Sequence, residues 1–334
     1  MTVSIRRRLT VLSVLPLIAL ASLVARAADV PTPAPAPPPV PVTGPAVKDA
    51  AMASGFLRFV DNGAAGGRLE TADVTYRNAD GVTVRLVSAV HIGEKTYYQG
   101  LADSFRGDDA VLYELVKPKD MVGAPKPNQP SKSTIGQFQH FLKDSLNLDF
   151  QLDDIDYSRA NFVHADLDAE TFEKMQEERG ESMFTLMLRQ MMDAMSKGDG
   201  GVGDLSDLNL MDELIKMVCR PDAERQLKLL LARHMQDAEK AMAGMEGPRG
   251  SVILTERNKA ALKVLADTLT KGKKQISVFY GAAHMPKMSE TLTTEMGFRP
   301  VSVEYRTAWD LRIRADQPSV IEQLLRDALK GLDE

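Results

Sequence analysis

Two histidines in this chain follow strand-like runs in the same way. Residues 276–280 are β-branched, small or aromatic, and the segment 281–284 (Gly-Ala-Ala-His) comes directly after them. Residues 82–87 form a similar run, which is followed by 88–91 (Ser-Ala-Val-His). Either histidine alone would more commonly be a packing or loop residue. The chain holds only five histidines, so two in matched settings favour a shared site.

A carboxylate ends a third strand-like run. Glu114 closes the apolar stretch 109–114, and a glutamate there is costly to bury unless it is paired or bound to a metal; the alternative is an exposed edge residue. Parallel strands end at one edge of a sheet, so we expect His91, Glu114 and His284 to meet around one pocket. Two imidazoles and a carboxylate suit a divalent ion with open positions. Such an ion polarises a carbonyl and lowers the pKa of bound water to roughly 7.

Further residues carry a family resemblance. The chain has Arg257-Asn258 ahead of the Gly281–His284 motif, and Glu114 at the end of an early strand. In these features it resembles the TraB/GumN family, which includes the Tiki-type membrane metalloproteases and is distantly similar to erythromycin-esterase-like and ChaN-like proteins. That family has two Gly-x-x-His motifs, whereas the first motif here begins with Ser88. The resemblance covers roughly residues 70 to 310.

The resemblance implies a metal-dependent hydrolase, with peptide bonds as the substrate class. It implies a divalent ion of the Mn, Co or Zn type, held by His91, Glu114 and His284. The implied catalytic residues are Glu114, Arg257 and His284, and the implied substrate-binding residues are Ser88, Gly281, Asn258 and Tyr280. Arg257 would face the charge that develops on the substrate oxygen, although a structural ion pair at a helix start is an equal alternative. The ChaN-like relatives suggest another reading, a non-catalytic exported protein that binds metal or haem.

The first 27 residues have the order of a secretory leader. Three arginines at 6–8 precede the apolar run Leu9–Val24, and Ala25–Ala27 is a small-residue cleavage site. The run has 16 residues, fewer than the ~20 that span a bilayer, which favours cleavage over an uncleaved anchor. We therefore expect export to the periplasm or the medium. Residues 28–50 are rich in Pro and Ala and are expected to form a disordered linker.

Composition is that of a soluble globular protein. Of 334 residues, 44% are hydrophobic and 26% charged, and the formal net charge is -5. Without the four arginines of the leader, 37 basic and 46 acidic side chains give -9, which disfavours nucleic acid and anionic lipid as partners. A single cysteine excludes an intramolecular disulfide and a thiolate cluster. The expected partner is a peptide or small-molecule substrate, with no stable membrane span after leader cleavage; the oligomeric state stays open.

Element patterns predict an α/β fold for residues 51–334, with a mixed β-sheet flanked by helices. The turn 78–81 joins two strands, and a helix at 94–105 then crosses over to the Glu114 strand. We expect an all-helical insertion at about 134–245, between the two halves that bear the histidine motifs. Methionines at helical spacing in it favour core filling, with an adaptable groove or mobile lid as the alternative. The remaining predicted elements are a helix that opens at 166–170 with Asp168 as a candidate N-cap, a helix at 258–269, strands at 275–280 and 300–306, and a terminal helix at 319–332.

Overall fold

The computed structural model describes residues 42–43, 55–121, 148–181, 225, 228–229, 231–235 and 250–312. The predicted leader, the methionine-rich segment 183–195, Cys219 and the predicted terminal helix lie outside these residues. None of the helices in the described ranges is long and apolar enough to cross a membrane.

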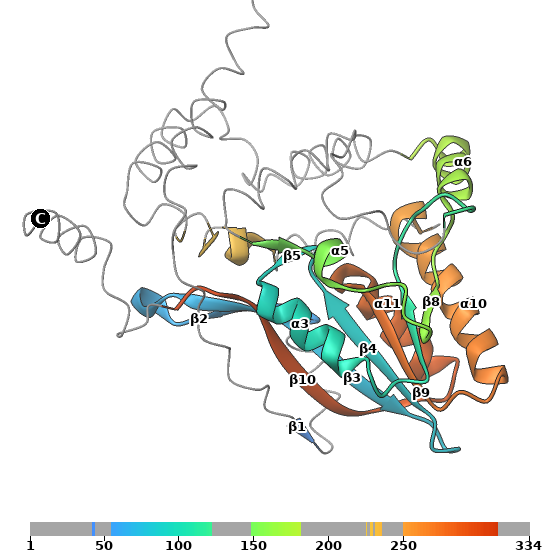
Figure 1. The fold of residues 1–334 in the computed structure, drawn as a ribbon, viewed down its shortest axis with the longest axis horizontal. Coiled ribbons are helices and arrows are strands. Elements are labelled where there is room, and N and C mark those ends of the chain that lie inside the picture. The colour runs from blue at the N-terminus through green and yellow to red at the C-terminus, as the bar shows by residue number, and fades with distance from the viewer. Residues whose placement is uncertain are drawn as a thin grey trace, which may run out of the picture.

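A mixed sheet of eight strands forms the centre of the fold (Figure 1). Its strands are β1 (Val42–Thr43), β2 (Leu57–Asp61), β3 (Gly67–Arg77), β4 (Thr83–Ala89), β6 (Ala110–Tyr113), β8 (Phe162–His164), β9 (Gln275–Gly281) and β10 (Arg299–Asp310). They lie in the order β1-β10-β3-β4-β9-β6-β8, and β2 also pairs with β3. The four from β4 to β8 run parallel, and the remaining pairs are antiparallel. The predicted α/β class is confirmed.

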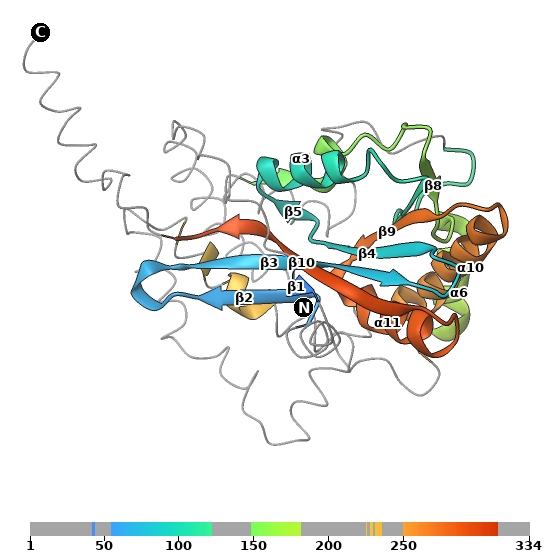
Figure 2. The ribbon, with the colours of Figure 1, turned by 90° about the horizontal axis from the view of Figure 1, so that it is seen from below.

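Helices cover both faces of the parallel part of this sheet. Figure 2 shows α3 (Lys95–Ser104) on one side and the pair α10 (Arg257–Thr270) and α11 (Met285–Thr294) on the other. Because the parallel strands are covered twice, their side chains are apolar on both faces. Leu86, Leu112 and Phe279, for example, are fully buried.

Local sequence explains how the chain enters and leaves these elements. In the β3–β4 hairpin the amide of Val82 donates to Asn78 Oδ1 at 2.9 Å, and Gly81 supplies a φ of +78°. After β8, Asp168 caps α6 (Ala169–Arg179) by accepting from the amide of Thr171 at 2.8 Å. The hairpin turn and the cap were both predicted, because both depend on neighbouring residues alone.

The segment 134–245 is not all helical, which corrects the prediction. It contributes β8, which pairs with β6 in the main sheet, and β7 (Asp149–Phe150), which pairs with β5 (Ile92–Gly93). A short helix, α5 (Gln151–Asp154), follows β7. These strands have two and three residues, too few to show an alternating pattern, and partners distant in sequence hold them.

The Pro-rich linker also departs from the prediction at two residues. Val42 and Thr43 form β1, which pairs with Val303 and Ser302 of β10. An edge strand presents unpaired amide and carbonyl groups, and Val and Thr are the β-formers of this stretch. In the sequence, Pro41 precedes this strand and Gly44-Pro45 follow it, and a proline has no amide hydrogen to offer a partner strand.

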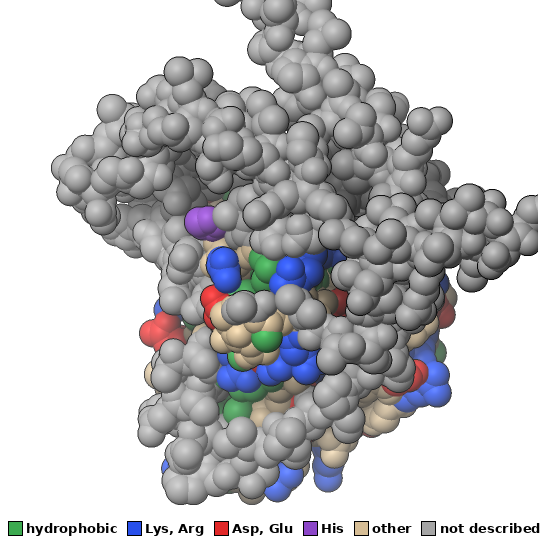
Figure 3. Space-filling model, turned by 90° about the vertical axis from the view of Figure 1, so that its left-hand side faces the viewer, with side chains coloured by type: hydrophobic (Ala, Val, Ile, Leu, Met, Phe, Trp, Pro, Cys, Tyr) green, Lys and Arg blue, Asp and Glu red, His purple; other side chains and the backbone are tan. Residues whose placement is uncertain are grey.

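The polar surface includes paired arginines at the β2 end of the sheet. Lysine and arginine side chains are prominent on the face in Figure 3. Arg58 and Arg68 both contact Glu70, at 2.8 and 2.7 Å, and Arg58 stacks 3.3 Å from the ring centre of Tyr305. In the described part of the predicted insertion, Arg233 lies 3.2 Å from Asp61 of β2.

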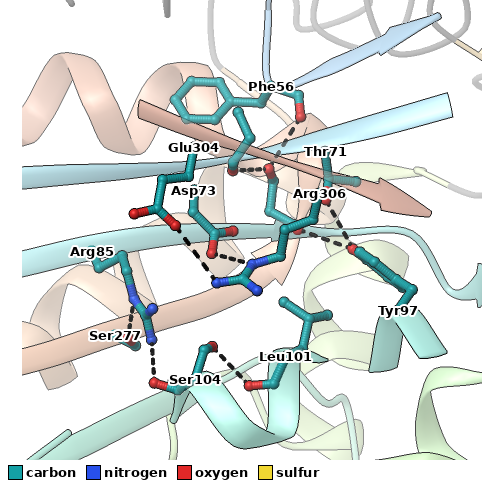
Figure 4. Close-up of polar contacts among 12 residues, drawn as sticks. Phe56, Thr71, Asp73, Arg85, Tyr97, Leu101, Ser104, Ser277, Glu304 and Arg306 are labelled. Atoms are coloured by element: carbon teal, nitrogen blue, oxygen red, sulfur yellow. Dashed lines mark hydrogen bonds and ion pairs between the residues drawn. The ribbon is translucent and has the colours of Figure 1, made fainter. Parts of the chain in front are cut away.

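A buried polar group lies between the sheet and α3, and we call it the α3 network. Arg306 of β10 donates to Asp73 of β3 at 2.7 Å, as Figure 4 shows. Arg85 of β4 contacts Ser277 of β9 and Asp108, both at 3.0 Å. Burial raises the pKa of Asp108, and Arg85 opposes that rise only in part. The α3 network therefore links β3 and β10 on one side of β4 with β9 on the other. Arg85 also donates to the carbonyl of Ser104 in α3, which connects the sheet to that helix.

Candidate functional site

The carboxyl ends of β4, β9 and β6 lie side by side, so the predicted residues share one edge of the sheet. Ala89 of β4 is in register with Gly281 of β9, and Tyr113 of β6 with Phe279. His91, His284 and Glu114 follow these positions by two, three and one residues. Open α/β sheets bind ligands outside the carboxyl ends of their strands, which is the edge that these three residues share.

Glu114 is buried, and its carboxylate accepts two hydrogen bonds and lies near a third polar group. Its Oε1 lies 2.7 Å from Arg257 Nη2 and 3.6 Å from His284 Nε2, and its Oε2 accepts from the amide of Gly281 at 2.6 Å. Burial alone would raise the pKa of Glu114. The charge of Arg257, with smaller contributions from His284 and His91, instead holds that pKa well below its usual range. Glu114 is therefore ionised at neutral pH.

Arg257 is shared between Glu114 and a second buried carboxylate, Asp166. The contact with Asp166 is two-pronged, with Nε at 3.0 Å from Oδ1 and Nη2 at 2.6 Å from Oδ2. The side chain of Asp166 is 0% exposed and that of Arg257 is 11% exposed. The two carboxylates raise the pKa of Arg257 despite its burial. We call Glu114, Asp166 and Arg257 the site group.

A short π-helical turn presents Arg257 and Asn258 to this edge. It spans Val252–Glu256, and Ser251 caps it by accepting from the amide of Leu254 at 3.0 Å. The turn runs directly into α10, so Arg257 and Asn258 are the first two residues of that helix. Such turns are wider than an α-helix and are frequent at functional sites.

Asn258 fixes the orientation of the His284 ring. Its amide nitrogen donates to the His284 carbonyl at 3.4 Å, and its Oδ1 lies 2.6 Å from His284 Nδ1. An amide oxygen only accepts, so Nδ1 carries a proton and a neutral imidazole keeps its lone pair on Nε2. That lone pair faces Glu114 Oε1 across 3.6 Å. Two acceptor atoms in this position need a cation between them, either a proton on Nε2 or a metal ion.

His284 is buried in the fold, although it follows the end of a strand. It ends the 3-10 turn Ala282–His284, is 4% exposed, and packs edge-on against Tyr280 with ring centres 5.2 Å apart. The Tyr280 hydroxyl donates to the carbonyl of Ala165. Burial, together with the charges of Asp166 and Glu114, raises the pKa of Tyr280 well above its usual value. Tyr280 therefore supports the His284 ring, and its hydroxyl is committed to the backbone.

A small residue is required at position 281. A Cβ there would lie 3.3 Å from Glu114 Oε2 and 3.8 Å from His284 Cδ2. Its structural counterpart in β4 is Ala89, because Ser88 is in register with Tyr280. Ser88 is fully buried, and its hydroxyl lies against the carbonyls of Ala72 and Phe56. The two histidine motifs are therefore offset by one residue. The Ser88 hydroxyl is committed to the carbonyls of Ala72 in β3 and of Phe56, which precedes β2, and it does not line the site.

His91 lies at the same edge but is exposed. Its carbonyl accepts from the amide of Gln151 at 3.1 Å, which holds the segment after β4. Its charge contributes to the lowered pKa of Glu114, so the two side chains are electrostatically coupled. Within the described residues, no three His, Cys, Asp or Glu side chains are arranged as a ready metal site. The structure thus places the side chains of Glu114 and His284 within contact distance, whereas the His91 side chain is exposed and outside that pair.

A polar cavity of about 150 Å³ adjoins the site group at Asp166. Its lining includes Lys117, Lys119 and His164, together with Asp166 and Asp168. Lys117 and Lys119 belong to the loop that follows Glu114, so this loop forms one wall of the cavity. Lys117 is 8% exposed and donates to the Tyr113 hydroxyl at 3.3 Å.

Comparison with family models, curated proteins and solved structures gives no match for this chain. The site is therefore interpreted from its own residues. Sequence analysis missed one of them, Asp166, because we assigned it to the start of a helix. An available signal was its position, two residues after the short strand Phe162–His164, which resembles the position of Glu114 after β6.

Proposed function

We propose that this protein is a metal-dependent hydrolase that acts on peptide bonds, with Glu114 and His284 as ligands of a divalent ion. The observation that carries the proposal is the pair of facing acceptors, Nε2 and Oε1, 3.6 Å apart. Ligand atoms about 2.0–2.2 Å from a tetrahedral ion lie roughly 3.3–3.6 Å from one another. The pair therefore fits a shared divalent ion without a large movement of either side chain.

The surroundings of His284 support the same interpretation. A metal-binding histidine usually donates its other ring nitrogen to a fixed acceptor, which sets the tautomer and the ring plane. Asn258 fills that role here, 2.6 Å from Nδ1. The resemblance to the TraB/GumN family adds His91 as a third ligand. Its imidazole is exposed, so it can turn toward the pair without breaking a buried contact.

The roles of the protein groups follow from their charges. A divalent ion, when bound, supplies Lewis-acid polarisation of the substrate carbonyl. Glu114 has a lowered pKa, so it is a poor proton acceptor and suits a ligand better than a general base. Arg257 is held by Asp166 and Glu114 through Nε and Nη2, and its other guanidinium N–H groups can stabilise negative charge on a substrate oxygen.

Export is part of the proposal, because it defines where the substrate is met. The order of charge, apolar run and small residues in the first 27 positions supports delivery to the periplasm or the medium. N-terminal sequencing of the exported protein should give a start near Ala28 or Asp29. An intact Met1 in a cytoplasmic pool would contradict this part alone.

The test of function uses the purified mature protein with a peptide library. We expect bound divalent metal by elemental analysis, peptide cleavage that stops with chelator, and recovery on adding Mn²⁺, Co²⁺ or Zn²⁺. Glu114→Gln and His284→Ala should lose activity, whereas His234→Ala, at an exposed histidine outside the site, should keep it. Cleavage that persists in chelator, or in both site variants, would contradict a metal-dependent hydrolase.

A further inference from the structure

Asp166 holds Arg257 more firmly than Glu114 does. It forms two hydrogen bonds to the guanidinium, through Nε and Nη2, whereas Glu114 forms one through the same Nη2. Its own position is fixed, because the amide of Leu167 donates to Oδ1 at 2.8 Å. A two-pronged contact sets the plane of a guanidinium as well as its position, which a single contact cannot do.

The two carboxylates also compete for one charge. A single guanidinium cannot neutralise both Glu114 and Asp166, and both side chains are at least nine-tenths buried. The stronger contact with Asp166 draws the positive charge of Arg257 toward β8. With Asp166 in place, Arg257 makes one contact with Glu114, from Nη2 to Oε1. Without Asp166, the guanidinium would be free to turn into a two-pronged contact that also covers Oε2 and closes over the whole carboxylate.

We propose that Asp166 is a positioning residue that keeps Arg257 from closing over Glu114, so that Glu114 stays available to a divalent ion. This inference rests on the proposed function, since it assigns Asp166 a role in ion binding at the Glu114–His284 pair. It differs from a structural ion pair in one respect. A structural pair affects folding alone, whereas Asp166 should affect ion affinity through Arg257.

The test is a double-mutant cycle with Co²⁺, whose visible absorption reports its ligands. Asp166→Asn should weaken Co²⁺ binding at least tenfold by calorimetry and alter the Co²⁺ spectrum. In an Arg257→Gln background the same substitution should change affinity less than twofold, because no guanidinium remains to move. The matched control is Asp108→Asn, which removes a buried partner of Arg85 away from the site and should leave Co²⁺ affinity unchanged.

The outcomes separate the two proposals. Equal weakening in both backgrounds would mean that Asp166 acts on the ion through space, and no weakening would mean a structural pair; either overturns the inference and leaves the proposed function intact. Absence of Co²⁺ binding by the wild-type protein would overturn both. If Arg257→Gln does not fold, Arg257→Lys replaces it. A lysine cannot form the two-pronged contact, so the effect of Asp166→Asn should shrink at least threefold there.

Discussion

The site group and the α3 network are both buried on the same sheet, but they balance charge differently. In the α3 network each aspartate has its own arginine: Asp108 pairs with Arg85 and Asp73 with Arg306, which also lies 4.0 Å from the partly exposed Glu304. In the site group one arginine serves two carboxylates, and the lone pair of His284 adds a further acceptor. A buried carboxylate is costly without a cation of its own, so the α3 network balances its two aspartates internally, although Asp73 Oδ1 has no hydrogen-bond partner. The site group has one cation for two buried carboxylates.

Position in the fold separates the two groups as well. The α3 network lies in the middle of the strands under a helix, where it ties β10, β3, β4 and β9 together. The site group lies where the parallel strands end and the chain turns into loops and helix starts. Side chains at these strand ends can be substituted without breaking the backbone hydrogen bonds of the sheet. Functional residues are commonly found at such positions, on loops that a rigid scaffold holds in place.

The largest expected effect is on the framework side of this comparison. Arg306→Met leaves Asp73, which is 2% exposed, without its cation, and we expect a loss of about 3–5 kcal/mol in urea unfolding. Divalent ions should not restore the loss, because Asp73 belongs to the α3 network and lies outside the proposed ion site. Arg106→Met, at an exposed pair with Asp103, is the control and should stay within about 0.5 kcal/mol. A loss below about 1 kcal/mol for Arg306→Met would contradict a structural role.

The next effect is on the site side. His284→Ala should abolish divalent-ion binding and destabilise the fold by about 1–3 kcal/mol, because Asn258 Oδ1 loses its buried donor. Calorimetric titration and urea unfolding measure the two quantities separately. His234→Ala should change neither. If His284→Ala still bound a divalent ion, the ion would lie at another site and the role of His284 as a ligand would be contradicted.

A smaller effect tests the close approach at Gly281. The backbone φ of -55° is open to alanine, so strain comes only from the methyl group beside Glu114 Oε2. We expect Gly281→Ala to weaken divalent-ion binding several-fold and to cost about 1 kcal/mol or less. Gly107→Ala is the matched control, since an added Cβ there meets nothing within 4 Å. Equal affinities for the two variants would remove the reason for a small residue at the motif.

The smallest effect is a difference in pH dependence between the two groups. Glu114 has a folded pKa below its ordinary 4.5, so its ionised form stabilises the fold above that pH and the contribution is lost as pH falls. Asp108 has a folded pKa above its ordinary 3.8, so the cost of ionising it appears as pH rises through that range. The free energy of unfolding is measured in urea from pH 3 to 7. Glu114→Gln should remove a loss of stability that the wild type shows as pH falls. Asp108→Asn should remove a loss of stability that the wild type shows as pH rises. If the two substitutions changed the slope of stability against pH in the same direction, the opposite pKa shifts of Glu114 and Asp108 would be contradicted.

Sequence was sufficient where the signal is local. The turn at 78–81, the cap at Asp168 and the strand ends that carry Glu114 and His284 each depend on a few adjacent residues. It failed where the partner is distant. Asp166 is buried because β8 joins the sheet beside β6, and Ser88 misses its predicted place because β4 pairs with β9 one residue out of step with the motifs. Strand registers and the positions of very short strands are determined by tertiary contacts, so they cannot be predicted from neighbouring residues alone.

The most direct test of the central claim is an anomalous difference map from crystals of the mature protein, stripped with chelator and soaked in Co²⁺. We predict a peak about 2.0–2.2 Å from both His284 Nε2 and Glu114 Oε1, with Asn258 still on Nδ1 and Arg257 still on Asp166. A map without density between these two atoms, and with His284 Nε2 moved to hydrogen-bonding distance of Glu114, would contradict it. The cation between the facing acceptors would then be a proton, and the site group would be a second structural network.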